Sequence, residues 1–111
     1  MRTNLKEALD ALESATRWLV ETFQRNPKAA AGVSVPYLKL FGTVAGGWMM
    51  ARAALVASAK FSEAGADRDF MKAKIATARF YAATVLPQAA GLARAVTHGG
   101  EATLELAAEQ F

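Results

Sequence analysis

The sequence predicts an all-α fold, an antiparallel up-and-down helical bundle of three long helices followed by a short C-terminal tail. Alanine fills 26 of the 111 positions and β-branched residues are sparse, a composition that favours helix over strand. Large apolar residues also recur at alternating steps of three and four in three separate segments. The length suits a single helical domain, residues 1–111, and 53% hydrophobic against 21% charged residues excludes a disordered chain.

The first segment has one apolar face, formed by Leu5, Leu9, Leu12, Thr16, Leu19 and Phe23. We expect Thr3 or Asn4 to cap its N-terminus, with Glu7 as a possible partner of Asn4 in a capping box. Asn26-Pro27 should end this helix, because proline disfavours the α conformation at the residue before it.

The second segment should open at Pro36, where the missing N–H costs nothing, and should stop at Gly65. Apolar residues step through it by three and four, namely Phe41, Val44, Trp48, Ala51 and Leu55. From Lys39 to Ala59 its only charges are Lys39 and Arg52, so the helix is apolar on almost all sides. We therefore expect a second copy of the chain or a missing neighbour to cover it.

The third segment should begin at Asp67, a favourable capping residue. Its apolar stripe is the most regular in the chain and consists of Met71, Ile75, Ala78, Ala82, Val85, Ala89, Leu92 and Val96. Pro87 interrupts the stripe, so we expect a kink near Ala83–Leu86. His98 and Gly99-Gly100 should end the helix, which leaves Glu101–Phe111 as a tail with one or two helical turns at most.

Targeting and membrane signals are weak in this sequence. Acids and bases alternate too early in residues 1–7 for a secretory signal. The longest uncharged runs, Leu40–Ala51 and Phe80–Ala93, fall short of the roughly 18 residues that suggest a membrane span. A net charge of +3, spread along the chain, does not indicate nucleic-acid binding. We expect a cytoplasmic protein with no membrane span and no nucleic-acid partner.

The residues predict no catalytic, cofactor-binding or metal site. The chain has no cysteine, and its single histidine, His98, is expected to complement the dipole of a helix C-terminus. No Glu-x-x-His metal signature is present, and Gly46-Gly47 lacks the Lys-Ser/Thr of a phosphate loop. The acids of the first helix, Glu7, Asp10 and Glu13, each lie near a base and indicate a solvated face.

Three other clusters have both a functional and a simpler interpretation. The bases Arg68, Lys72, Lys74 and Arg79 could bind phosphates or an acidic partner, but a solvated face is favoured. The aromatic clusters Trp48-Met49-Met50 and Phe80-Tyr81 could line a ligand slot, but buried aromatics at helical spacing are more often core. Gly42 and Gly46 lie four residues apart on one face, where another backbone can approach closely.

Two stretches resemble a domain of a known family. Residues 36–52, PYLKLFGTVAGGWMMAR, are similar to the second helix of a C-terminal extension in one branch of the acyl-CoA dehydrogenases, which includes methylthiopropionyl-CoA dehydrogenase-like enzymes. Residues 80–93, FYAATVLPQAAGLA, followed by Val96-Thr97 and Gly99-Gly100, are similar to the helix that closes this extension. The terminal Glu109-Gln110-Phe111 is similar to the usual C-terminus of those proteins.

The resemblance implies a C-terminal fragment of a larger flavoenzyme. Acyl-CoA dehydrogenases of this branch have a helical N-terminal domain, a small β domain and a four-helix domain before the extension. They remove two hydrogens across the α,β bond of an acyl-CoA thioester, with a glutamate as base and FAD as hydride acceptor. FAD is therefore expected in the preceding domains, and no catalytic or cofactor residue is carried over to this chain.

The resemblance further implies a non-catalytic domain that braces the catalytic domains or the subunit interface of a homo-oligomer. As a hypothesis, Gly42, Gly46, Trp48 and Met49 form the packing interface. The alternative is a freestanding helical module that self-associates or binds a partner through the same surface. A small enzyme or metal protein in its own right has almost no support in the sequence.

Overall fold

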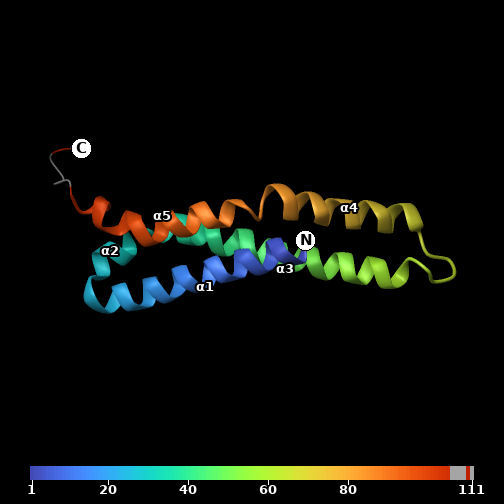
Figure 1. Ribbon diagram of the computed structural model, residues 1–111, viewed down its shortest axis with the longest axis horizontal. Helices are drawn as coiled ribbons and strands as arrows, with labels where there is room; N and C mark the ends of the chain where they lie inside the picture. Colours follow the sequence, from blue (N-terminus) through green and yellow to red (C-terminus); the bar gives the residue numbers. More distant parts are fainter. Residues whose placement is uncertain (106–109, 111) are drawn as a thin grey trace.

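The computed structural model describes residues 1–105 and 110, which form α-helices and no β-strand (Figure 1). The helices are α1 (Arg2–Arg25), α2 (Pro27–Ala31), α3 (Ser34–Lys60), α4 (Arg68–Thr84) and α5 (Gln88–Thr103). α1, α3 and α4 run in alternating directions, and α5 continues along the line of α4 (Figure 1). The predicted all-α class is confirmed. Part of the predicted tail, residues 106–109 and 111, lies outside the described residues.

The long helices are staggered, which makes the molecule elongated. It measures 65 × 27 × 18 Å, and its radius of gyration is 18.4 Å, compared with about 13 Å for a compact domain of this length. At one end α1, α2 and α5 surround the first half of α3, whereas at the other end α3 and α4 form a hairpin that extends past the N-terminus (Figure 1). The bundle is therefore three helices thick along only half of α3.

The core consists mainly of alanine. The buried apolar residues are Ala8, Ala15, Ala29, Ala30, Val33, Leu40, Val44, Ala57, Ala78, Ala82, Leu86, Ala89 and Val96. No aromatic side chain in the described part of the chain belongs to this buried set. Small side chains let helices approach closely, but each buried CH₂ group contributes only about 0.8 kcal/mol. The core is therefore tightly packed but poor in buried apolar area.

Pro87 divides the predicted third helix into α4 and α5. The N–H groups of Val85 and Leu86 both donate to the carbonyl oxygen of Tyr81, at 2.8 and 3.1 Å. The predicted kink is thus confirmed, as a full interruption over residues 85–87. Every position of the predicted stripe, from Met71 to Val96, is buried or half-buried.

The N-terminus of α1 differs from the prediction. α1 begins at Arg2 with Met1 as its N-cap, and neither Thr3 nor Asn4 caps it. Asn4 instead donates from Nδ2 to the carbonyl oxygen of Ala82, at 2.7 Å. A regular helix would occupy that oxygen with the N–H of Leu86, which the break before Pro87 redirects to Tyr81. Asn4 therefore supplies a hydrogen bond to a free carbonyl group of α4 and does not cap its own helix.

The connections follow the sequence signals with small shifts. Asn26-Pro27 ends α1 as predicted, and the Asn26 side chain also caps α2, an unpredicted helix, by accepting from the N–H of Ala29 at 3.3 Å. α3 begins two residues before Pro36 and ends at Lys60, and Gly65 lies in the following turn with a φ of +79°. Asp67 caps α4 as predicted, accepting from the N–H of Phe70 at 3.1 Å.

Gly99-Gly100 does not end the last helix, because α5 continues to Thr103. Gly100 is buried, and a Cβ atom there would lie 2.8 Å from the carbonyl oxygen of Ala29 and 3.0 Å from the Trp18 ring. This glycine allows α5 to approach α2 and α1, and it does not act as a stop signal. As a consequence His98 lies inside α5 and not at a helix C-terminus.

We predict that Gly100→Ala lowers the free energy of unfolding by about 1–3 kcal/mol, because the backbone of α2 must move to admit the methyl group. Gly91→Ala is the matched control in the same helix, since nothing lies within 4 Å of its added Cβ. It should stabilise the chain by about 0.5–1 kcal/mol through helix propensity. Urea denaturation of both variants measures the difference, and equal effects would contradict the close approach at Gly100.

Candidate functional site

The side of α3 that faces away from the core is apolar along most of its length. We call this surface the α3 outer face; its side chains are between 47% and 71% exposed and are Leu38, Phe41, Trp48, Met49, Leu55 and Val56. Their spacing of three, four and seven places them on one side of the helix. The stripe is about 27 Å long at 1.5 Å per residue.

Three of the five residues in the predicted apolar stripe of this helix face solvent and not the core. Val44 is buried and Ala51 half-buried as expected, but Phe41, Trp48 and Leu55 are exposed. Trp48 is therefore not a core residue, and the exposed Phe80 on α4 is not one either. The cause is that α3 is apolar all round, so periodicity does not select a side.

Gly46 and Gly47 mark the true inner side of α3. A Cβ at Gly47 would overlap the Leu86 side chain, and a Cβ at Gly46 would overlap the Tyr81 hydroxyl. The residues that approach these glycines come from α4 and from the turn that follows it. The close approach predicted at Gly46 thus occurs within the chain and involves a side chain, not a backbone.

The predicted packing interface is accordingly split between two sides of α3. Trp48 and Met49 belong to the α3 outer face, and Gly42 is exposed with nothing within 4 Å of an added Cβ. Gly46 faces α4 instead. Gly46→Leu would disturb packing inside the chain and would not report on an outside contact. That Gly42, Trp48 and Met49 meet another surface stays a prediction.

Two tyrosine hydroxyls hold α3 at this rotation. Tyr81 on α4 donates to the carbonyl oxygen of Thr43 at 2.7 Å, and burial raises the pKa of Tyr81 above its usual 10. On the other side, the Tyr37 hydroxyl lies 2.8 Å from Thr16 Oγ1 of α1. Since Thr16 donates its only proton to Leu12, Tyr37 is the donor in that pair. Both bonds oppose rotation of α3 and so keep its apolar side outward.

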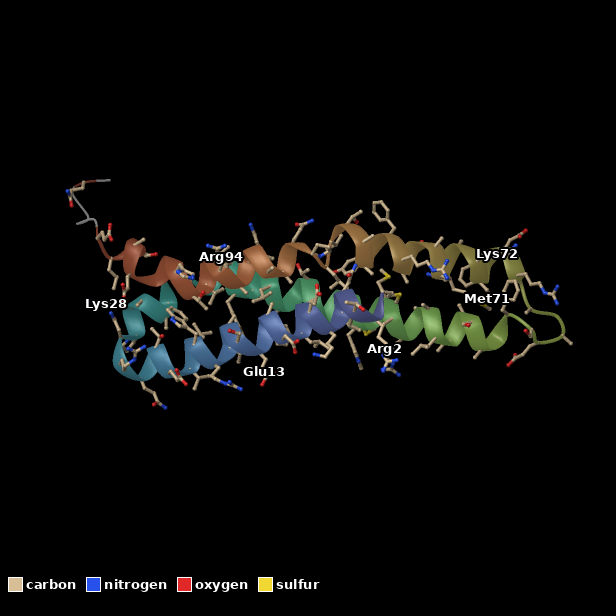
Figure 2. All side chains as sticks on the ribbon, in the orientation of Figure 1. Arg2, Glu13, Lys28, Met71, Lys72 and Arg94 are labelled. Atoms are coloured by element: carbon tan, nitrogen blue, oxygen red, sulfur yellow. The ribbon has the colours of Figure 1, made fainter. Side chains whose placement is uncertain are left out.

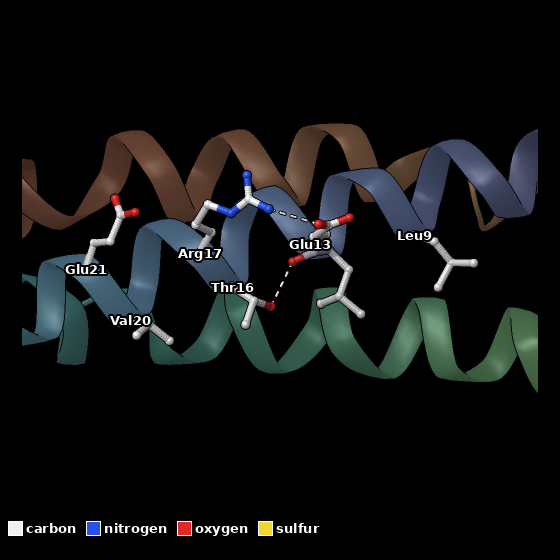
Figure 3. A pocket seen from close by; sticks show the side chains of 7 residues that line it. Leu9, Glu13, Thr16, Arg17, Val20 and Glu21 are labelled. Atoms are coloured by element: carbon white, nitrogen blue, oxygen red, sulfur yellow. Dashed lines mark hydrogen bonds and ion pairs between the residues drawn. The ribbon is translucent and has the colours of Figure 1, made fainter.

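The apolar surface continues onto α1. Figure 3 shows a shallow groove on α1, with Glu13, Arg17 and Glu21 along one border; its other lining residues are Leu9, Leu12, Thr16 and Val20. Val20 and Phe23 line a second depression beside α2. A third lies between Leu5, Leu55 and Ile75, where the hairpin passes the start of α1. Shallow apolar depressions of this kind fit a protein surface better than a small molecule.

The charged clusters are exposed to solvent, as predicted. The two ion pairs of α1 join Lys6 to Asp10 at 3.1 Å and Arg17 to Glu13 at 2.9 Å, and all four side chains are exposed. The bases of α4 are exposed too, and Figure 2 shows Lys72 near the end of the hairpin. Within the described residues, no group of three His, Cys, Asp or Glu side chains could hold a metal ion.

A polar pocket of about 290 Å³ lies where α1, α2 and α5 meet. Its lining residues are Trp18, Thr22, Arg25, Asn26, Ala29, Thr97, His98 and Glu101. Thr22 Oγ1 is buried there without a hydrogen-bond partner in the described part of the chain. No ion pair links the charged residues of this pocket, so it offers no orienting pair of the kind that acid–base catalysis needs.

By length and composition, α3 is able to cross a membrane. It passes this test over a window longer than the twelve-residue uncharged run in its centre, because its 27 residues carry only three charges, all of them cations. The core helix of a soluble protein passes the same test, so this feature is weak support for a membrane span. The absence of a span stays a prediction.

The sequence model of the family described as "Acetyl-CoA dehydrogenase C-terminal like" matches residues 1–107. The chain belongs to this family. It is 36% identical over 100 residues to the 3-methylmercaptopropionyl-CoA dehydrogenase of Ruegeria pomeroyi. That match covers 90% of the chain but 17% of the relative, in its C-terminal part. No solved structure matches the chain. The resemblance inferred from residues 36–52 and 80–100 is confirmed.

For this acetyl-CoA dehydrogenase C-terminal-like domain, we predict that Tyr81→Phe lowers the free energy of unfolding by about 1 kcal/mol at neutral pH. Because the folded-state pKa of Tyr81 is raised, the hydroxyl contributes fully below pH 10 and its contribution is lost as the pH rises through the folded-state pKa. Chemical denaturation at neutral and strongly alkaline pH measures the free energy of unfolding of both proteins. The difference between wild type and variant should become smaller above pH 10. A gap that does not change with pH would refute this role.

Proposed function

We propose that residues 1–111 form the non-catalytic C-terminal helical domain of an FAD-dependent acyl-CoA dehydrogenase. The domain would brace the catalytic domains or the subunit interface of a homo-oligomeric enzyme that carries out α,β-dehydrogenation of an acyl-CoA. The family match over residues 1–107 supports this proposal, as does the similarity to the C-terminal part of 3-methylmercaptopropionyl-CoA dehydrogenase.

The α3 outer face is the observation that carries the bracing role. Its six side chains would remove roughly 700 Å² of apolar surface from water if each free side chain offers about 200 Å². This area is close to the roughly 800 Å² that one partner contributes to a standard protein interface. The buried core consists mainly of small side chains, so most of the large apolar residues of α3 lie outside it. A covering surface gives these residues the burial that the chain itself does not provide.

The described residues form no enclosed polar pocket of the size that FAD needs. The polar pocket of about 290 Å³ is smaller than the roughly 300–1,000 Å³ of pockets for drug-sized ligands. The other large depressions, of about 360, 630 and 650 Å³, are open to solvent and mostly apolar. Gly46 and Gly47 lie inside a helix with side chains packed against them, so their backbone cannot cradle a phosphate. We therefore assign the flavin to the preceding domains.

Sequencing the DNA upstream of the Met1 codon tests the parentage. We expect a continuous reading frame that encodes flavin-binding domains. A stop codon and ribosome-binding site directly upstream would instead support a freestanding module that self-associates or binds a partner.

Leu38→Asp and Met49→Asp should each weaken docking of this domain in the parent enzyme by roughly 10- to 100-fold, because each places a charge in an apolar contact. Hydrogen exchange of α3 amides in the full-length enzyme measures docking. The control is Phe80→Asp, which changes an equally exposed side chain on α4 and should leave docking unchanged.

In the 111-residue chain alone, the same two substitutions should change stability by no more than about 0.5 kcal/mol, because the side chains are exposed there. Unchanged protection of α3 in the full-length variants would refute the bracing role. If the 111-residue chain forms an oligomer that the same substitutions dissociate, the freestanding module is the better interpretation.

A further inference from the structure

One charged residue lies in the middle of the apolar surface described above. Arg52 is exposed on α3, with Trp48 and Met49 one turn before it and Leu55 and Val56 one turn after it. All four neighbours are exposed members of the α3 outer face. Its guanidinium carbon lies 4.9 Å from the centroid of the Trp48 ring, so the ring supports the charged group from one side.

No carboxylate of the described residues neutralises Arg52. The two ion pairs in the described part of the chain both lie within α1, between Lys6 and Asp10 and between Glu13 and Arg17. In the sequence there is no aspartate or glutamate between Glu21 and Glu63. α3 and α2 therefore carry only basic charges, and while the face is open, water solvates Arg52.

When another surface covers the α3 outer face, Arg52 loses its solvation by water. A surface that buries Trp48, Met49, Leu55 and Val56 also removes water from Arg52, which lies among them. A guanidinium buried without a partner is strongly destabilising, whereas a carboxylate in bidentate contact offsets the loss of solvation. The covering surface must therefore combine apolar side chains with a carboxylate.

A second copy packed α3 against α3 does not meet this requirement, because α3 contains no acid. We propose that the surface covering the α3 outer face belongs to a preceding domain of the dehydrogenase and carries an aspartate or glutamate that pairs with Arg52. This inference rests on the proposed function and adds the chemistry of the partner: an apolar helical or sheet surface with one acid opposite Arg52. The pair fixes the position at which the domain docks.

A zero-length cross-link identifies the acid directly. Arg52→Lys in the full-length enzyme places an amine at this position, and a carbodiimide joins that amine to a carboxylate in contact with it, with loss of water. Mass spectrometry should find a cross-linked peptide that connects α3 to an acid outside residues 1–111. The control is Arg94→Lys on α5, an exposed arginine that is not on the α3 outer face and should give no such peptide.

Substitution at Arg52 gives an independent readout. Arg52→Leu should lower hydrogen-exchange protection of α3 in the full-length enzyme at least about tenfold, because it leaves the acid buried and unpaired. Arg52→Glu should lower it further, since two carboxylates would then meet. Arg94→Leu is the matched control and should have no effect.

The outcomes separate this inference from the proposed function. If Leu38→Asp and Met49→Asp abolish docking but Arg52→Leu does not and no cross-link forms, the domain docks there without an acid and this inference is wrong. If Leu38→Asp and Met49→Asp leave docking unchanged, the bracing role itself fails. A cross-link to an acid within residues 1–111 of another subunit would identify a second copy, and cosedimentation of the full-length enzyme with anionic phosphatidylserine vesicles that requires Arg52 would identify lipid phosphate. Either result would overturn the proposed partner.

Discussion

The arrangement of this domain depends on how closely small residues let α3 approach its neighbours. Gly47 receives Leu86, Gly46 receives Tyr81, and Gly100 allows α5 to reach the backbone of α2. At Gly46 and Gly47 a single added Cβ would overlap a side chain of a neighbouring segment, so α3 cannot turn about its axis without clashes. The hydrogen bond from Tyr81 to Thr43 reinforces the same rotation. These contacts place Gly46 and Gly47 inside, and most of the large residues of α3 face outward, apart from the buried Leu40 and Val44.

How much of the fold can be predicted from sequence depends on how one-sided each apolar pattern is. The stripe from Met71 to Val96 occupies one side of its helix, so its spacing identified the buried side correctly, including the interruption at Pro87. In α3 the apolar residues surround the helix, and the same spacing selected Phe41, Trp48 and Leu55, which are exposed. The inner side of α3 combines Gly46 and Gly47 with the buried Leu40 and Val44, and the spacing of its large residues alone does not identify that side.

Other differences from the sequence-based predictions arise from contacts between distant parts of the chain, which local sequence patterns do not reveal. Gly99-Gly100 has the composition of a helix stop, and only the position of Ala29 shows that Gly100 is a contact. Asn4 has the chemistry of a cap, but its partner is a carbonyl of Ala82, 78 residues away, that the break at Pro87 leaves free. Asn26-Pro27 both ends α1 and supplies the N-cap and first-turn residues of α2, and the end signal alone does not predict the second, five-residue helix. The candidate surface was partly predicted, since Trp48 and Met49 lie on it and Gly46 does not.

Because most of the large apolar residues of α3 face outward, the surface that covers them decides how the domain docks. Apolar contact alone has no preferred register, since a stripe of leucine, methionine and aromatic side chains can slide along another apolar surface at little cost. A single charge within the stripe removes this freedom, because only one position pairs it and every other position buries it alone. Arg52 is the one charge flanked by the large residues of the α3 outer face, and Trp48 restricts its guanidinium before any partner arrives. Burial would thus supply the affinity of the contact, while the charge would determine its register.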